Sequence, residues 1–436
     1  MSYSKVLIVG VHLRENYGDG VTVRNLFYGW PEDMLFFAAT GEMVNQLSGC
    51  IAYETYQLGT SENRVAWPFS LFFNRFPSMV LKRGYGCHNL CNTLSYNSVR
   101  LKSSVRKNAV RILHFVGLYN IVFKLKPSVL FLQWVRQIEP DIIYFHPNSY
   151  QLIEFVHLTS KLSGVKAIYH VMDGTIHDVN KLGLLYFIWN SKTLKLIDSL
   201  NKRLAYALCI SDKMSEVLKD QHGKDFMVFH NTVDVRAWKR TKTSSSGDGT
   251  FRITYAGRIG YDNWLVIANI ARAIDHLRNQ GFRVSFFVYS SNMPAHFIKV
   301  VTKYSSSCIL PPVSYENIHE VLHRTDLLTI PLGFSKRSFR FSWLSMPTKT
   351  VEYMSSGVPI LVIAPQGTAL YQYACDCGWA IVLNDCSIET IADKIGSIID
   401  GKVETVGYAD KAYSIAMNSH DRSIISSKFR QILQNA

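Results

Sequence analysis

The segment PTKTVEY, residues 347–353, places a lysine and a glutamate three residues apart at the start of a predicted helix. Pro347 suits a helix entry, and the backbone N–H groups near Thr348 and Lys349 can receive an anion with help from the helix dipole. Lys349 adds a positive charge, and the carboxylate of Glu352 can accept hydrogen bonds from a ribose diol. The pattern therefore predicts a site for a phosphate and a sugar. A helix with a favourable first-turn glutamate and a surface lysine explains it equally well.

A second candidate phosphate contact follows a predicted strand. In YAGRIG, Gly257 and Arg258 come directly after an apolar run. A glycine lets a ligand approach the main chain, and an arginine can bind phosphate oxygens through two parallel hydrogen bonds. Because a glycine after a strand is common, an ordinary turn is the alternative.

The elements that must position these residues alternate along the whole chain. Short, β-branched apolar runs are separated by helical patterns, which is typical of doubly wound α/β domains. One set spans residues 1–240 and a second spans residues 241–405, with the polar segment KRTKTSSSGDGT between them as a linker. Residues 406–436 are predicted to be helical, and this C-terminal segment can pack back on the first domain. We therefore expect two Rossmann-like domains that face a central cleft, with ligands at the carboxyl ends of the strands.

The positive charge of the chain is concentrated in one stretch. The formal net charge is +14, and between Glu62 and Glu139 there are twelve lysines and arginines and no acidic residue. Large apolar residues lie among them, and a basic, aromatic-rich amphipathic segment fits an anionic membrane surface. A nucleic-acid surface and the solvated face of a helix are competing interpretations. We favour a membrane contact through residues 63–138 and expect no nucleic-acid partner.

Composition indicates a globular protein. Hydrophobic residues make up 47% of the chain, and the apolar run LGLLYFIW, among the longest, has the length of a strand or core segment. The first residues lack a signal-peptide pattern, so we expect a cytoplasmic protein. The eight cysteines include the pairs in CHNLC and CDC, which lack zinc-ribbon spacing and are expected to be ordinary thiols.

Taken in order, YAGRIG, LLTIPLG, PTKTVEYMSSGVPIL and a later Gly-Trp pair resemble the family 4-like glycosyltransferases of the GT-B fold, of the bacterial surface-polysaccharide type. In that family the Gly-Arg pair faces the donor pyrophosphate, and the glutamate of the Pro-x-Lys-x-x-Glu-Tyr segment holds the ribose. The resemblance implies catalytic roles for Arg258 and Lys349, which would offset charge on the leaving diphosphate. The donor-binding residues it implies are Gly257, Arg258, Thr348, Lys349 and Glu352.

The resemblance is looser in the first domain. NYGDGVT lies where the family has a glycine-rich loop, so Gly18 and Gly20 are expected near the donor phosphates or the acceptor, although a plain turn explains them nearly as well. Asp173 ends a predicted strand where the family often has a His-Asp pair, and it is the preferred base or polar contact. Met172 occupies the histidine position, and His170 fits a core histidine as readily as a site residue.

Two features depart from the family pattern. Many members carry a second glutamate, with seven residues between it and the ribose-binding one, and this chain has Leu344 there. A second basic residue soon after Gly-Arg is also missing. Lys336, Arg337 and Arg340 in FSKRSFRFSW can supply that charge, or they can form a mobile basic loop. Leu344 and Met172 favour, as an alternative, a non-catalytic GT-B protein that binds a sugar nucleotide or a membrane partner.

The favoured hypothesis is a glycosyltransferase that moves a sugar from a nucleotide diphosphate donor to an acceptor hydroxyl. The basic stretch suggests a lipid-linked or other membrane-proximal glycan at the inner face of the cell membrane. The resemblance implies retention of anomeric configuration and no metal or cofactor, because helix dipoles and basic side chains stabilise the leaving group. A sugar-nucleotide epimerase is a third hypothesis, but a basic membrane segment has no use when substrate and product are both soluble.

Overall fold

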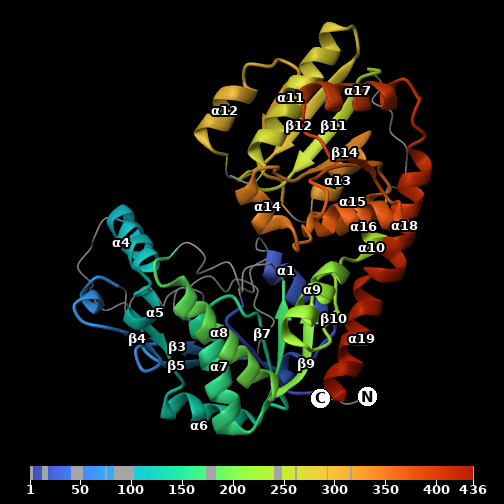
Figure 1. Ribbon diagram of the computed structural model, residues 1–436. Coiled ribbons are helices and arrows are strands. Elements are labelled where there is room, and N and C mark those ends of the chain that lie inside the picture. The colour runs from blue at the N-terminus through green and yellow to red at the C-terminus, as the bar shows by residue number, and fades with distance from the viewer. Residues whose placement is uncertain are drawn as a thin grey trace. The chain divides into compact units, whose positions relative to one another are not determined.

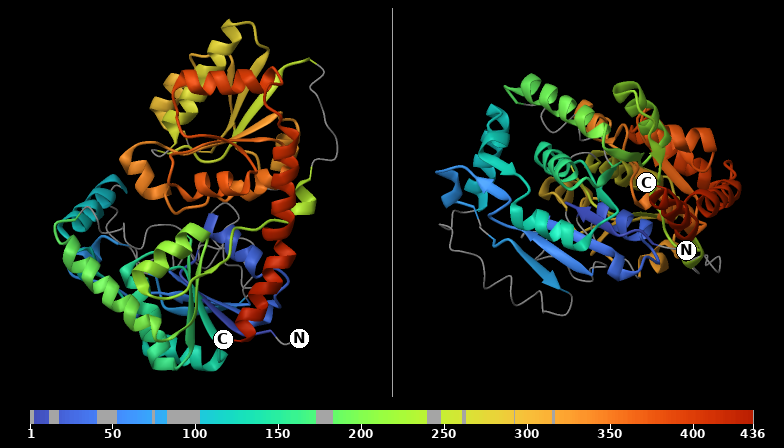
Figure 2. Two further views of the ribbon diagram at one scale, coloured as in Figure 1. Left: turned by 45° about the vertical axis from the view of Figure 1, so that its right-hand side comes forward. Right: turned by 90° about the horizontal axis from the view of Figure 1, so that it is seen from below.

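The computed structural model describes residues 3–11, 18–40, 53–73, 76–82, 103–172, 183–239, 248–260, 263–291, 293–314 and 317–435, and the chain divides into two compact units (Figures 1 and 2). The first unit comprises Met1–Ile210, Ser215–Phe229 and Ser426–Ala436. The second comprises Ser211–Met214 and His230–Ile425. Each unit is built around its own sheet.

The first unit has an eight-stranded sheet in the order β10-β9-β8-β7-β1-β2-β3-β5, which is parallel except for β5. A short antiparallel pair, β4 and β6, lies outside it. The strands are β1 (Val6–Val9), β2 (Leu35–Thr40), β3 (Glu54–Leu58), β4 (Asn63–Val65), β5 (Met79–Lys82), β6 (Phe123–Leu125), β7 (Ile142–Phe145), β8 (Lys166–Val171), β9 (Leu204–Cys209) and β10 (Met227–Val228). The helices are α1 (Gly18–Leu26), α4 (Ser103–Val116), α5 (Tyr119–Val122), α6 (Val129–Ile138), α7 (Tyr150–Ser163), α8 (Tyr186–Asn201), α9 (Asp212–His222) and α19 (Arg422–Gln434), with 3-10 turns η1 (Glu32–Met34) and η2 (Phe69–Leu71).

The central strands of the first sheet are buried on both faces, as their uninterrupted apolar sequences require. All four residues of β1 and of β7 are buried. On one face, the rings of Phe27, Tyr144 and Phe429 meet edge to face, with ring centroids 5.1 to 5.9 Å apart. Because Phe429 belongs to α19, the end of the chain completes the core of the first unit.

The second unit has a six-stranded parallel sheet in the order β13-β12-β11-β14-β15-β16. Its strands are β11 (Phe251–Ala256), β12 (Val284–Tyr289), β13 (Ser307–Leu310), β14 (Leu327–Pro331), β15 (Ile360–Ile363) and β16 (Ile381–Leu383). Numbered from β11, this is the strand order 3-2-1-4-5-6 of a doubly wound dinucleotide-binding sheet. The order reverses between β11 and β14, which are hydrogen-bonded neighbours.

Helices cover both faces of the second sheet (Figure 1). Helix α11 packs against α12 and α17, and α15 packs against α10, α13 and α18. These helices are α10 (Val235–Trp238), α11 (Trp264–Asn279), α12 (Ala295–Val301), α13 (Ile318–His323), α14 (Lys336–Ser342), α15 (Lys349–Ser356), α16 (Ala369–Cys377), α17 (Ile388–Ile399) and α18 (Val406–Ser419). The amphipathic pattern of α11 buries Val266, Ile267, Ile270, Ile274 and Leu277.

The doubly wound α/β class predicted from the sequence is confirmed in both units. In the described part of the chain, no helix combines the length and the apolar character needed to cross a membrane.

Candidate functional site

The candidate donor site lies at the point where the strand order of the second sheet reverses. Gly257 and Arg258 follow β11, and the chain that leaves β14 passes through α14 before it enters α15 at Lys349. Because β11 and β14 are parallel neighbours, the segments that leave their carboxyl ends emerge at the same edge. Ligands of doubly wound sheets bind in the crevice at such a switch point.

Gly257 and Lys349 meet at this edge. The N–H group of Gly257 donates a hydrogen bond to the carbonyl oxygen of Tyr289 at 2.9 Å, and its φ is +149°. A Cβ atom on Gly257 would lie 2.2 Å from the Nζ atom of Lys349, so the ammonium group rests against the glycine main chain. The same ammonium lies 3.9 Å from the ring centroid of the buried Tyr255, a cation–π contact. Strand β11 thus holds the charge of Lys349 in one place.

Two residues that sequence reasoning missed hold the main chain of Arg258. The hydroxyl of Tyr255 donates to the carbonyl oxygen of Arg258 at 2.6 Å. The side-chain amide of the buried Asn263 donates to that oxygen at 3.2 Å and to the Tyr255 hydroxyl at 2.9 Å, and its Oδ1 accepts from the N–H of Gly260 at 2.9 Å. The loop is therefore fastened while the Arg258 side chain is exposed. The position of Asn263 directly before a predicted helix was the one sequence feature that could have indicated its role.

Helix α15 is tied to the end of β11 by a tyrosine. The hydroxyl of Tyr353 accepts a hydrogen bond from the N–H of Ala256 at 2.8 Å and donates to its carbonyl oxygen at 3.2 Å. Burial raises the pKa of Tyr353, so this hydroxyl stays neutral. The helix ends at Gly357, whose φ is +71°. Thr348 is its N-cap residue and makes no side-chain capping bond within the described part of the chain.

The carboxyl group of Glu352 has a pKa near neutral pH. It is partly buried one turn after Lys349, and burial raises its pKa to about 7, although the charge of Lys349 acts in the opposite direction. Near neutral pH the group therefore exchanges between a proton donor and a charged acceptor. A ligand hydroxyl that donates to Glu352 would favour the charged form.

The structure brings together some of the predicted site residues. Gly257 and Lys349 touch, Arg258 follows Gly257, and Thr348 and Glu352 flank Lys349 on the same helix. Gly18 and Gly20 form the first turn of α1 in the first unit, and their role in donor binding stays a prediction. Asp173 lies outside the described residues.

Two residues noted in the sequence have clear positions. His170 is fully buried in β8, its Nδ1 is hydrogen-bonded to the Tyr144 hydroxyl at 2.8 Å, and burial lowers its pKa to about 3. It is a neutral core histidine. The side chain of Leu344 is buried, and its carbonyl oxygen accepts a hydrogen bond from the Ser211 hydroxyl at 3.2 Å.

The basic stretch FSKRSFRFSW forms helix α14 rather than a loop. The hydroxyl of Ser335 caps it by accepting a hydrogen bond from the N–H of Ser338 at 3.0 Å. Lys336, Arg337 and Arg340 are exposed on this helix.

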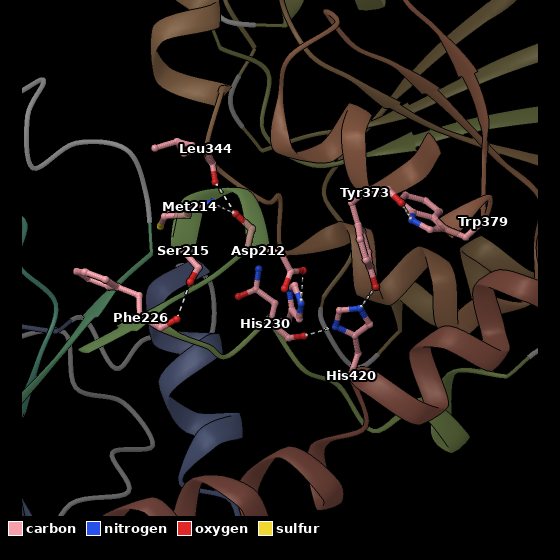
Figure 3. Close-up of polar contacts among 11 residues, drawn as sticks. Asp212, Met214, Ser215, Phe226, His230, Leu344, Tyr373, Trp379 and His420 are labelled. Atoms are coloured by element: carbon pink, nitrogen blue, oxygen red, sulfur yellow. Dashed lines mark hydrogen bonds and ion pairs between the residues drawn. The ribbon is translucent and has the colours of Figure 1, made fainter. Parts of the chain in front are cut away.

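A second cluster of polar side chains in the same unit holds segments of the fold together (Figure 3). The Nδ1–H of His420 donates to the carbonyl oxygen of Asn231 at 3.2 Å, which leaves Nε2 to accept from the Tyr373 hydroxyl at 2.8 Å. Burial lowers the pKa of His420 to about 3, so the ring is neutral. His230 stacks on the Tyr373 ring and approaches Asp212 at 3.5 Å, which lowers the pKa of that carboxyl group. The cluster joins α16 to the start and end of the unit.

The sequence predicts no metal site and ordinary thiols at the cysteines. Among the described residues, no group of three or more His, Cys, Asp or Glu side chains is placed to hold a metal ion. Free thiols are found at Cys209, Cys308, Cys375, Cys377 and Cys386. The CHNLC pair lies outside the described residues.

Comparison with known proteins identifies the fold. No protein-family profile matches the chain, and no curated protein matches its sequence. Among solved structures, HepE of Anabaena in complex with UDP matches over 99% of this chain and 100% of its own, with a TM-score of 0.60 and 14% identity. WaaG, a glycosyltransferase involved in lipopolysaccharide biosynthesis, matches over 99% and 100%, with a TM-score of 0.57 and 11% identity. The α,α-trehalose 6-phosphate synthase of Burkholderia multivorans matches over 99% and 97%, with a TM-score of 0.57 and 12% identity. The chain has the GT-B fold, with two Rossmann-like domains.

A Gly257→Ala substitution tests the contact between β11 and Lys349. At a φ of +149° a side chain is strained by about 1–3 kcal/mol, and the new methyl group would displace the Lys349 ammonium. We expect lower stability in denaturant unfolding and weaker binding of nucleoside diphosphates in calorimetric titration. Gly281→Ala is the matched control, because its φ is +96° and a Cβ there meets open space. Equal nucleotide affinity in the two variants would contradict the contact.

Proposed function

We propose that the protein is a glycosyltransferase that uses a nucleoside diphosphate sugar as donor. The observation that carries the proposal is the ammonium group of Lys349, held against the main chain of Gly257 at the switch point of a doubly wound sheet. A glycine without a side chain lets a diphosphate approach the backbone, and the adjacent Arg258 and Lys349 supply two positive charges for it. UDP is the first nucleotide to test, since HepE of the same fold has been solved with UDP.

Each residue of the site takes one part of the reaction. The glycosidic bond between the anomeric carbon and the β-phosphate oxygen breaks while the acceptor oxygen bonds to that carbon from the same face, and the acceptor proton passes to the departing phosphate oxygen. Lys349 and Arg258 offset the charge that develops on the departing diphosphate, which is the task a metal ion performs in other enzymes. Glu352, as a carboxylate, accepts hydrogen bonds from the two ribose hydroxyls and fixes the nucleoside.

The acceptor side of the proposal rests on the first unit. Asp173 is the preferred base or polar contact, and Gly18 and Gly20 are proposed near the donor phosphates or the acceptor, as the family resemblance implies. The basic stretch between Glu62 and Glu139 supports a lipid-linked or membrane-proximal glycan as acceptor and a place at the inner face of the cell membrane. Metal-independent transfer with retention of configuration, in polysaccharide biosynthesis, completes the proposal.

Transfer is tested with a radiolabelled sugar nucleotide and a lipid extract of the membranes of the source cell. The proposal expects the label to enter the lipid fraction with an equimolar release of nucleoside diphosphate. Release that does not depend on the extract, or none at all, would contradict transfer to such an acceptor.

A non-catalytic sugar-nucleotide-binding protein is the second candidate. The buried, apolar side chain of Leu344, at a position where many members of the resembling family carry a carboxylate, favours it. Binding of the nucleotide without any transfer in the same assay would select this candidate.

A further inference from the structure

Helices α4 and α5 and the start of α8 lie close together in the first unit (Figure 1). Exposed apolar side chains are found on all three helices and in the turn before α8. The side chain of Phe187 is 82% exposed and that of Leu184 is 69% exposed. Large apolar groups so far out of the protein interior indicate a surface that another body covers. We call this surface the apolar patch, and its members are Ile112, Phe115, Leu118, Ile121, Leu184, Phe187 and Ile188.

Two segments that are far apart in the sequence are fastened together in the apolar patch. The N–H of Leu184 donates a hydrogen bond to the carbonyl oxygen of Phe115 at 2.7 Å. The indole N–H of Trp189 donates to the carbonyl oxygen of Gly117 at 2.6 Å. A Cβ atom on Gly117 would lie 2.6 Å from Cβ of Leu185, so the turn after α4 fits closely against the start of α8. The patch is therefore one built surface rather than scattered side chains.

The helices that carry the apolar patch are rich in basic residues. The sequence has no acidic residue between Glu62 and Glu139, which includes α4 and α5, and none from Gly183 to Ile197 on the α8 side. The Nζ atom of Lys192 lies 4.7 Å from the ring centroid of Trp189, which places a positive charge at the base of the patch. The exposed basic residues on these helices are Lys107, Arg111, Lys192 and Lys195, and Lys124 is exposed in β6, which directly follows α5.

We propose that the apolar patch and its basic residues bind the surface of an anionic lipid bilayer. Apolar side chains enter the boundary between headgroups and acyl chains, and lysines and arginines contact anionic headgroups. Charge complementarity selects this occupant, because the basic residues of α4 and α8 attract anionic headgroups and repel a second copy of the same surface. The inference extends the membrane-proximal part of the proposed function, and lipid binding needs no nucleotide.

The test is flotation of the full chain with phosphatidylglycerol–phosphatidylcholine vesicles and with pure phosphatidylcholine vesicles. We expect binding to the anionic vesicles, at least tenfold weaker binding to the neutral ones, and loss of binding at high salt. The double variant Leu184→Ser/Phe187→Ser should bind the anionic vesicles at least tenfold more weakly. Val129→Ser/Leu130→Ser, two exposed apolar residues of α6, is the matched control and should bind as the unmodified chain does.

Three outcomes would overturn the proposal. They are absence of vesicle binding, equal binding to neutral vesicles, and equal binding by the Leu184→Ser/Phe187→Ser variant. The thermal shift with UDP is recorded for each variant, since an unchanged shift shows that the second unit is folded. A failure of lipid binding is then distinct from a failure of the donor site. Loss of a dimer in the variant, without vesicle binding by the unmodified chain, would assign the patch to self-association instead.

Discussion

Replacing Lys349 by methionine is expected to slow the release of nucleoside diphosphate from the sugar nucleotide by about 10²–10³-fold. Preorganised positive groups aimed at the charge of a leaving group contribute on this scale, and Lys349 is held by Gly257 and Tyr255 before any ligand arrives. Methionine keeps the apolar stem and removes the ammonium group. The rate is measured as release of nucleoside diphosphate at saturating donor in the presence of the lipid extract.

The control for Lys349→Met separates local from general charge effects. Lys299→Met removes an exposed lysine from α12 in the same unit and should leave the rate unchanged. A Lys349→Met enzyme with unchanged turnover would remove the leaving-group role. An equal loss in both variants would point to the net charge of the protein rather than to this residue.

The affinity for nucleoside diphosphates is expected to rise with pH from 6 to 8, because the carboxyl group of Glu352 must lose its proton to accept from the ribose hydroxyls. In the free protein burial raises its pKa to about 7, so below that value binding must first expel a proton. The affinity should therefore fall by at most about tenfold for each pH unit below 7 and level off above it. Glu352→Gln should flatten this dependence and weaken binding at pH 8 by about ten- to a hundredfold, since charge-assisted bonds of about 1.5–3 kcal/mol are lost.

The Glu352 experiment is a calorimetric titration with UDP at several pH values. The same series with Glu352→Gln corrects for the titration of the phosphates, which both proteins experience equally. Parallel profiles in the two proteins would contradict a carboxylate at the ribose. The raised pKa also predicts that Glu352 lowers the stability of the free protein as pH rises from 4.5 through 7, because the folded chain then holds a proton that the unfolded chain releases.

Local patterns were sufficient to predict most of the second unit. Strand β15 is an uninterrupted apolar run, β11 and β14 are short and mostly apolar, and α15 has Pro347 before it and Gly357 after it. These signals depend on residues that are neighbours in the sequence, so they can be seen without the fold. The proximity of Gly257 and Lys349, ninety-two positions apart, followed from the family resemblance and not from any local pattern.

The supporting residues could not be predicted, because their roles depend on where side chains point. Tyr353 looks like a core tyrosine in α15, yet its hydroxyl reaches the main chain of Ala256 in β11. Asn263 looks like a helix cap, and it also holds the carbonyl oxygen of Arg258. Both contacts require the distance between two elements, which the sequence does not contain.

The exposure of the run LGLLYFIW could not be predicted from the sequence either. Its length and composition suit a strand or a core segment, but its described residues form a turn at 183–185 and the start of α8 at 186–189, with Leu184 and Phe187 exposed. Periodicity tells which residues share a face, and it does not tell which face meets the protein. The apolar patch depends on the hydrogen bond between Leu184 and Phe115, which lie 69 positions apart in the sequence.

Thermal unfolding of the full chain with UDP, GDP, dTDP and CDP, with Glu352→Ala in parallel, tests the central claim most directly. A nucleotide at about a hundred times its dissociation constant should raise the free energy of unfolding by about 2.7 kcal/mol. We predict such a shift with one of the four nucleotides and a much smaller one in Glu352→Ala. Absence of a shift with every nucleotide would contradict a donor site at Lys349 and Glu352, and so would an equal shift in the variant.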